Sequence, residues 1–119
     1  AGPPLHQEIK FAAQEPLKGF SSCTGYGFKG LVTDRNGTRL QGVQIVVWEE
    51  QAGLVALDTT NPNGNYLIEI KDSPAARRFC VHIYQNEIPL SRLVLLETHI
   101  DCQTGFQVFQ IDWHQLYSP

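Results

Sequence analysis

The chain has 119 residues, 42% of them hydrophobic, which fits one globular domain and is too apolar for a disordered chain. Its formal net charge is −3 and no basic cluster exceeds the pair Arg77-Arg78, so we expect no nucleic-acid partner. Because the longest apolar runs are short and interrupted by polar residues, we also expect no membrane span.

The sequence contains no methionine, even at position 1, which indicates a processed chain. The first residues, Ala1-Gly2-Pro3-Pro4, suit the product of a signal peptidase, and the alternative is a tag remnant or an excised fragment. Exported proteins are able to form disulfides. The sequence therefore predicts a secreted protein, outside the cell or on its surface.

The first 22 residues are predicted to form an arm and a linker ahead of a domain that spans residues 23–119. Residues 5–13 are flanked by prolines, and their apolar pattern suits either one strand or one short helix. Residues 14–22 carry Pro, Gly and Ser, as linkers do. A strand over residues 5–13 would place four apolar side chains on one face: Leu5, Ile9, Phe11 and Ala13.

Beyond residue 21 the pattern is that of strands separated by turns, with no convincing helix. Val43, Ile45 and Val47 alternate with other residues, as in a half-buried strand, and residues 61–65 (Asn-Pro-Asn-Gly-Asn) form a turn. In the last strand the apolar set changes face between Val108 and Phe109, which predicts a bulge. About seven short strands predict an antiparallel all-β sandwich. They span residues 28–32, 43–48, 54–60, 66–70, 79–84, 90–97 and 106–113.

Spaced glycines and apolar residues between positions 30 and 70, roughly a third of the chain, form a recognisable motif. It consists of Gly30-x-Val32-x-Asp34-x-x-Gly37-x-x-Leu40-x-Gly42-Val43-x-Ile45 followed by Thr60-x-x-x-Gly64-x-Tyr66. The motif resembles the carboxypeptidase regulatory-like domain of secreted bacterial proteins. This resemblance implies a seven-stranded Ig-like or transthyretin-like (prealbumin-like) sandwich. It also implies an accessory, adhesive or structural module without catalytic residues.

Three cysteines leave at least one without a partner inside the chain. Cys23 and Cys102 each lie just before a predicted strand, and this placement is similar to a bacterial extracellular subgroup of the same family. The resemblance implies a Cys23–Cys102 disulfide, for which chain entropy gives a benefit of roughly 4 kcal/mol. Cys80 is then a small side chain under a loop, or a reactive or intermolecular thiol. A different pairing is the remaining alternative.

The sequence predicts no catalytic centre, no metal site and no cofactor. None of its four histidines has a histidine partner at i+4 or a Cys-x-x-Cys nearby. Cys80 and His82 would share one strand face, but two ligands do not make a metal site. Ser91, His99 and Asp101 are residue types that hydrolases use, but the sequence has no Gly-x-Ser-x-Gly elbow. We therefore expect a protein that is not an enzyme.

Two aromatic residues are candidate surface contacts. Trp48 is out of phase with the apolar residues of its strand and is expected on the outer face. There it could stack on a sugar ring or anchor a protein partner, or be covered by the N-terminal arm. Tyr84 is expected on the same side of its strand as Cys80 and His82.

Three functions compete at this point. The first is a self-assembling surface or fibre subunit whose arm adds a strand to a neighbouring copy, as exposed sheet edges allow. The second is a passive spacer or stalk within a larger surface protein, with a neighbouring domain as its partner. The third is a module that binds carbohydrate or protein through surface aromatics. We favour assembly because it accounts for the arm, the linker and the odd cysteine together.

Overall fold

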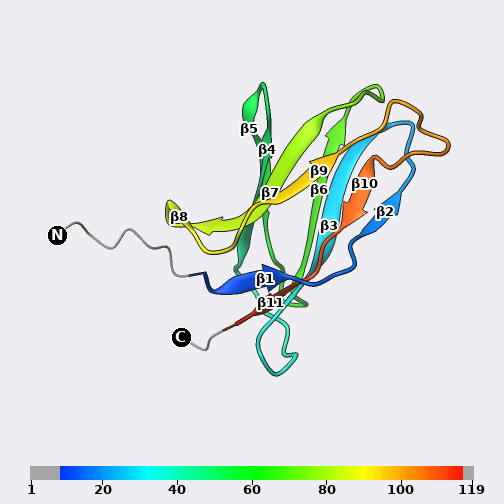
Figure 1. The fold of residues 1–119 in the computed structure, drawn as a ribbon. Coiled ribbons are helices and arrows are strands. Elements are labelled where there is room, and N and C mark those ends of the chain that lie inside the picture. The colour runs from blue at the N-terminus through cyan, green and yellow to red at the C-terminus, as the bar shows by residue number, and fades with distance from the viewer. Residues whose placement is uncertain (1–8, 117–119) are drawn as a thin grey trace.

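The computed structural model describes residues 9–116, which form eleven strands and no helix (Figure 1). They make two sheets packed face to face, so the predicted all-β sandwich is confirmed, with more strands than the predicted seven. In chain order the strands are β1 (Phe11–Ala13), β2 (Lys18–Phe20), β3 (Gly25–Thr33), β4 (Gln44–Glu49), β5 (Gly53–Thr59), β6 (Asn65–Lys71), β7 (Arg78–Gln85), β8 (Ile88–Pro89), β9 (Val94–Glu97), β10 (Val108–Gln110) and β11 (Trp113–Gln115).

The first sheet is built around β3. On one side β3 pairs antiparallel with β6, and on the other it pairs parallel with both β10 and β11. Outside these two strands lie β2, antiparallel to β10, and β1, antiparallel to β11. The sequence-based expectation of a purely antiparallel sandwich is therefore wrong for this sheet, because the last strands of the chain run in the same direction as β3.

The second sheet has the order β5-β4-β7, and β7 also pairs with β9 and with the short β8. All its strand pairs are antiparallel, with a bulge in the β4–β5 register between Val47 and Trp48. Ile45 and Val47 on β4 and Val81 and Ile83 on β7 are fully buried between the sheets, as their alternation predicted. The even positions of both strands consequently face outwards.

The last predicted strand is interrupted. Its break lies between β10 and β11, at Ile111 and Asp112, rather than at the expected bulge near Val108. The carbonyl of Ile111 accepts the hydroxyl of Tyr66 at 2.7 Å, and the carboxylate of Asp112 accepts the amide of Leu31 at 2.9 Å. A Cβ on Gly30 would lie 1.9 Å from the Ile111 carbonyl oxygen. A glycine therefore allows the broken strand to approach β3.

The other extra strands lie where turn-forming residues suggested irregular structure. The predicted linker contains β2, which holds Gly19 and follows Pro16. The predicted strand over residues 90–97 begins later, as β9, and is preceded by β8. A tight turn at Asn86 and Glu87, both with positive φ, joins β8 to β7. Short edge strands of this kind leave little hydrophobic pattern in a sequence.

Candidate assembly and contact sites

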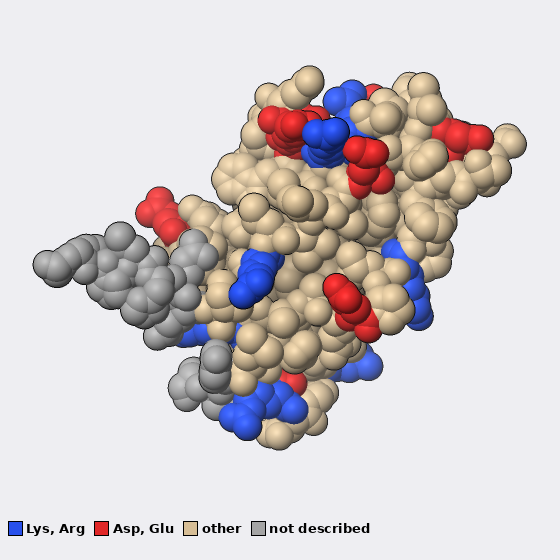
Figure 2. All heavy atoms as spheres, in the orientation of Figure 1, with Lys and Arg blue, Asp and Glu red and all other residues tan. Residues whose placement is uncertain are grey.

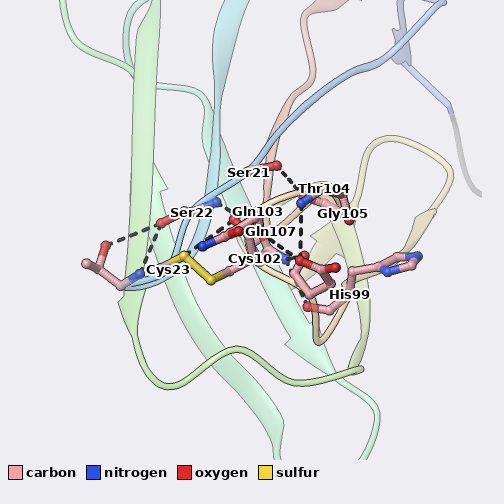
Figure 3. The surroundings of a disulfide bond; sticks show 11 residues. Ser21, Ser22, Cys23, His99, Cys102, Gln103, Thr104, Gly105 and Gln107 are labelled. Carbon is pink, nitrogen blue, oxygen red and sulfur yellow. Dashed lines mark hydrogen bonds between the residues drawn. A yellow bond between two sulfur atoms is a disulfide. The ribbon is translucent and has the colours of Figure 1, made fainter.

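The predicted Cys23–Cys102 disulfide is present (Figure 3). Cys23 lies two residues before β3 and Cys102 lies in the loop before β10, and these two strands run parallel side by side. Residues that precede parallel neighbouring strands meet at the same end of a sheet. The strand directions therefore bring together two cysteines that are 79 residues apart in the sequence.

A buried glutamine reinforces this end of the sandwich. The side chain of Gln107 is fully buried, accepts the amide of Ser22 at 2.8 Å and donates to the carbonyls of His99 and Asp101 at 2.9 and 3.0 Å. Figure 3 shows these bonds next to the disulfide. The carboxylate of Asp101 accepts backbone amides of the same loop, chiefly that of Gln103, which lowers its pKa. The loop is thus anchored by both covalent and polar contacts.

The described part of the predicted arm forms β1 and pairs within its own chain. Phe11 faces Gln115 in the register of β1 and β11 and is buried in the core. The amides of Lys10 and Phe11 both donate to the carbonyl of Leu90, which belongs to the connection between β8 and β9. Ala13 packs against the core, whereas Leu5 lies outside the described residues. Residues 10–13 therefore occupy a slot with β11 on one side and Leu90 on the other.

The two candidate contact residues come together on the outer face of the second sheet. Trp48 projects outwards from β4 and donates its indole N–H to Nε2 of His82 on β7, at 2.8 Å. The ring centroids of Trp48 and Tyr84 are 6.2 Å apart, and those of His82 and Tyr84 are 5.3 Å apart. Trp48 is half-buried by these rings. The arm does not provide this cover in the described residues, because Phe11 lies in the core.

His82 connects this aromatic cluster and was not recognised as a contact residue from the sequence. An indole N–H can only donate, so Nε2 of His82 accepts and the proton of the neutral ring is on Nδ1. Nδ1 is buried and has no hydrogen-bond partner among the described residues. Burial lowers the pKa of His82 below its ordinary value. Neither ring nitrogen therefore has a free lone pair for a metal ion beside Cys80.

Cys80 is outside the disulfide and lies half-buried in the same outer face. In the strand registers it is directly opposite Trp48 on β4 and Leu95 on β9. It lines an apolar hollow of about 440 Å³ together with Phe79, Leu95 and Leu96, and this hollow is bordered by Glu50, Arg78 and Glu97. The thiol is thus set in an apolar surface on the outside of the sandwich.

The central part of the outer face is apolar, and Arg78 and Glu97 lie at one end of it. We define this apolar part by eight residues: Val46, Trp48, Leu54, Leu57, Cys80, His82, Tyr84 and Leu95. Val46 and His82 form a buried floor, with 2% and 5% exposure, while Leu54, Leu57 and Leu95 protrude with 50%, 49% and 73% exposure. Figure 2 shows acidic and basic side chains side by side at one end of the molecule, and single acidic and basic side chains separated by uncharged surface over the rest of the face in view.

The residue types of a hydrolase have structural roles in separate places. The hydroxyl of Ser91 is buried, accepts the amide of Ile83 at 2.9 Å and donates to the carbonyl of Arg92. His99 and Asp101 belong instead to the loop at the disulfide. Within residues 9–116, no three His, Cys, Asp or Glu side chains are grouped so that they could hold a metal ion. The same range contains no helix capable of crossing a membrane.

Comparison with known proteins gives no family. No family model and no curated protein matches the chain. Among solved structures, a C-terminal fragment of the pilus adhesin SpaC from Lactobacillus rhamnosus GG matches at 11% identity and a TM-score of 0.47. The match covers 82% of this chain and 47% of the fragment, so the chain spans less than half of that fragment's length.

A second match is 3-chlorocatechol 1,2-dioxygenase from Rhodococcus opacus 1CP, with 9% identity and a TM-score of 0.45. It covers 98% of this chain and 70% of the enzyme. An adhesin fragment and an enzyme thus match about equally, and neither likeness assigns a function. The chain belongs to the class of disulfide-bonded, two-sheet β-sandwiches, and its resemblance to carboxypeptidase regulatory-like domains stays a prediction.

Proposed function

We propose that this chain is a non-catalytic extracellular structural subunit that assembles with copies of itself by exchanging its N-terminal arm. The observation that carries the proposal is the slot described above. The segment at residues 10–13 bonds to two parts of the chain that are distant in sequence, Leu90 and β11. Every partner of this segment would be equally present in a neighbouring copy.

Exchange conserves the contacts of the arm. Phe11 would fill the same core position in another copy, and its amide would donate to that copy's Leu90 carbonyl. Residues 14–17 connect β1 to β2, which would stay paired with β10 of its own chain. Replacing an internal contact by an identical external one is an inexpensive route to oligomers. Repeated head to tail, exchange builds a fibre unless the rotation closes a ring.

The extracellular part of the proposal is supported by the disulfide, since such bonds persist in oxidising compartments. The non-catalytic part is supported by the roles of the polar residues. Ser91 is bonded to backbone groups within the fold, and His82 is bonded to Trp48. The partners of this chain are accordingly other copies of itself or a neighbouring surface domain, with no cofactor.

The test is a cross-link that reports which chain supplies the arm. Ala12 and His114 are directly opposed in the β1–β11 register, and opposed antiparallel residues lie at Cα distances suited to a disulfide. Ala12→Cys and His114→Cys are introduced together with Cys80→Ser and oxidised over a range of protein concentrations. Exchange predicts a ladder of cross-linked multimers on a non-reducing gel that grows with concentration.

A matched control uses Gln44→Cys and Thr59→Cys, opposed residues of β4 and β5 that no exchange of the arm would separate. This pair should give only cross-linked monomer. If the 12–114 pair also gives only monomer at every concentration, the arm stays in its own chain and the proposal is wrong. A passive spacer would then remain, or a glycan-binding module whose binding is lost in Trp48→Ala.

A further inference from the structure

We propose that Asn36 is a modification site, at which the folded chain converts this asparagine to aspartate and isoaspartate without an enzyme. The sequence contains two Asn-Gly pairs, Asn36-Gly37 and Asn63-Gly64. Because glycine has no Cβ to shield its amide nitrogen, that nitrogen readily reaches the side chain of a preceding asparagine. The fold leaves the first pair reactive and protects the second.

The reaction needs only the chain and water. The amide nitrogen of Gly37 attacks Cγ of Asn36, so that an N–Cγ bond forms and the Cγ–Nδ2 bond breaks. Ammonia leaves and takes the proton of the glycine amide with it. Water then opens the resulting succinimide ring at either of its carbonyls, which gives aspartate or isoaspartate. Each product carries a carboxylate that is ionised at neutral pH, and no oxidation or reduction takes place.

The two Asn-Gly pairs lie in turns that have the same hydrogen bonds. Each glycine amide donates to the carbonyl three residues earlier, at 3.1 Å for Gly37 and 2.8 Å for Gly64. The residue that accepts this bond, Asp34 or Asn61, also accepts two further amides of its turn through its side chain. Both reactive asparagines are exposed. Local sequence and turn geometry therefore do not distinguish the two sites.

The surroundings of the two glycines do distinguish them. Gly37 is exposed, and a Cβ built on it would meet no atom of the described residues within 4 Å beyond its chain neighbours. Figure 1 shows its turn, between β3 and β4, projecting from the lower end of the sandwich. Gly64 is buried, and its carbonyl accepts the amide of Val32 at 2.8 Å. A Cβ on Gly64 would lie 2.9 Å from both the carbonyl oxygen of Val32 and Cβ of Arg39.

This difference in packing controls the attack. The glycine amide has to leave its hydrogen bond, and the peptide unit has to rotate towards the asparagine side chain. At Gly37 this rotation moves an exposed turn, which costs little free energy. At Gly64 it would break the bond to Val32 and displace the backbone of β3, so the site opens only with a larger part of the fold.

The modification changes the end of β3. Isoaspartate carries the backbone through its side-chain carbon, which lengthens the turn, and either product places a carboxylate close to that of Asp34. The carboxylate of Asp34 accepts the amides of Asn36 and Thr38, and a longer turn cannot keep both bonds in place. Thr33, just before this turn, pairs with His114 of β11. New negative charge therefore accumulates with time beside the strand that holds the arm.

The experiment follows the acidic forms of the folded chain during incubation at mildly alkaline pH, where amide nitrogens lose their proton more readily. Isoelectric focusing counts the added charges, and peptide mapping by mass spectrometry assigns their positions. Asn36→Gln and Asn63→Gln are the matched variants, because both residues occupy the same position in their turns. We expect Asn36 to react at least about tenfold faster than Asn63, since only the second needs opening of packed structure. Asn36→Gln should remove the main acidic form, and Asn63→Gln should leave it.

A second incubation, in guanidinium chloride, separates the effect of the fold from that of the sequence. In the unfolded chain both glycine amides are free, so Asn36 and Asn63 should react at similar rates. The proposal is overturned if Asn63 reacts as fast as Asn36 in the folded chain, or if the main acidic form persists in Asn36→Gln. It is also overturned if Asn36 reacts only after unfolding, which would show that its turn is protected as well. Both readouts are made on single chains and do not depend on exchange of the arm.

Discussion

The indole of Trp48 holds His82 in one protonation state. Its N–H donates to Nε2 of His82 at 2.8 Å, so the ring can gain a second proton only by losing this bond. The other nitrogen, Nδ1, is already protonated, and it is buried with no hydrogen-bond partner within residues 9–116. A charge on His82 would therefore be both desolvated and deprived of its neighbour. The aromatic cluster of the outer face depends on a neutral imidazole.

The first prediction concerns the loss of folding stability at acidic pH. Burial lowers the pKa of His82 in the folded chain, whereas the unfolded chain titrates near 6.5. Below that pH the unfolded state binds more protons than the folded state. The contribution of His82 to the free energy of unfolding is therefore complete above about pH 6.5, and it is lost as the pH falls from there through the lower pKa of the folded chain. Urea unfolding of the unmodified chain between pH 8 and 5 should show this loss, and His82→Gln should reduce it. Equal pH dependence in both proteins would contradict the assignment.

The second prediction concerns the disulfide. Replacing Cys23 and Cys102 together by Ser removes a cross-link that closes a loop of 79 residues. The chain-entropy model gives a loss of roughly 4 kcal/mol in the free energy of unfolding. Urea unfolding checks this value. Cys80→Ser is the matched control, because Cys80 has no disulfide partner within the chain, and it should leave stability nearly unchanged.

The third prediction concerns the closest approach between β3 and the broken last strand. Gly30→Ala places a methyl group 1.9 Å from the backbone oxygen of Ile111, and backbone cannot move aside as a side chain can. We expect a loss of about 3 kcal/mol or more, at the upper end of overpacking effects. In Gly27→Ala, on the same strand, the new atom meets the side chain of Val108 at 3.3 Å, and the carbonyl oxygen of Ile68 is at an ordinary contact distance of 3.6 Å. In thermal unfolding, the melting temperature of Gly30→Ala should be well below that of Gly27→Ala.

The fourth prediction is a stabilising change. Glu87 has φ of 63° in the turn between β7 and β8, a conformation that costs a residue with a Cβ about 1 kcal/mol and glycine almost nothing. Glu87→Gly should therefore raise stability by roughly 0.5 kcal/mol after the extra freedom of the unfolded chain is counted. A similar change in an extended strand, Glu69→Gly, should lower it. A decrease for Glu87→Gly would argue against the turn.

The alternation of residues along single strands predicted correctly which side chains face the core. Contacts between strands could not be predicted from the sequence. Val47 and Trp48 were assigned to opposite faces of β4 because strand geometry fixes this locally. The bond between Trp48 and His82 depends on the register of β4 against β7, which no local pattern contains. The parallel pairing of β3 with β10 was missed for the same reason.

The arm shows a further limit. The sequence left residues 5–13 open as a strand or a helix; in the structure residues 11–13 form β1, and Phe11 and Ala13 both pack against the core. Their partner β11 lies about a hundred residues away in the sequence, so the pairing depends on the finished sandwich. The disulfide was predictable only through a family resemblance, since three cysteines allow other pairings.

The arrangement of β1, β11 and the disulfide has a mechanical consequence. Phe11 faces Gln115 in an antiparallel pair, so the chain enters β1 and leaves β11 at the same end. A pull on these two points separates β1 from β11 and then β2 from β10, and it must also detach β11 and β10 from β3 and the arm from Leu90. It stops at the Cys23–Cys102 bond, beyond which tension passes from sulfur to sulfur. Residues 24–101 stay out of the path of the force, and the domain yields by a short, fixed length before it becomes inextensible.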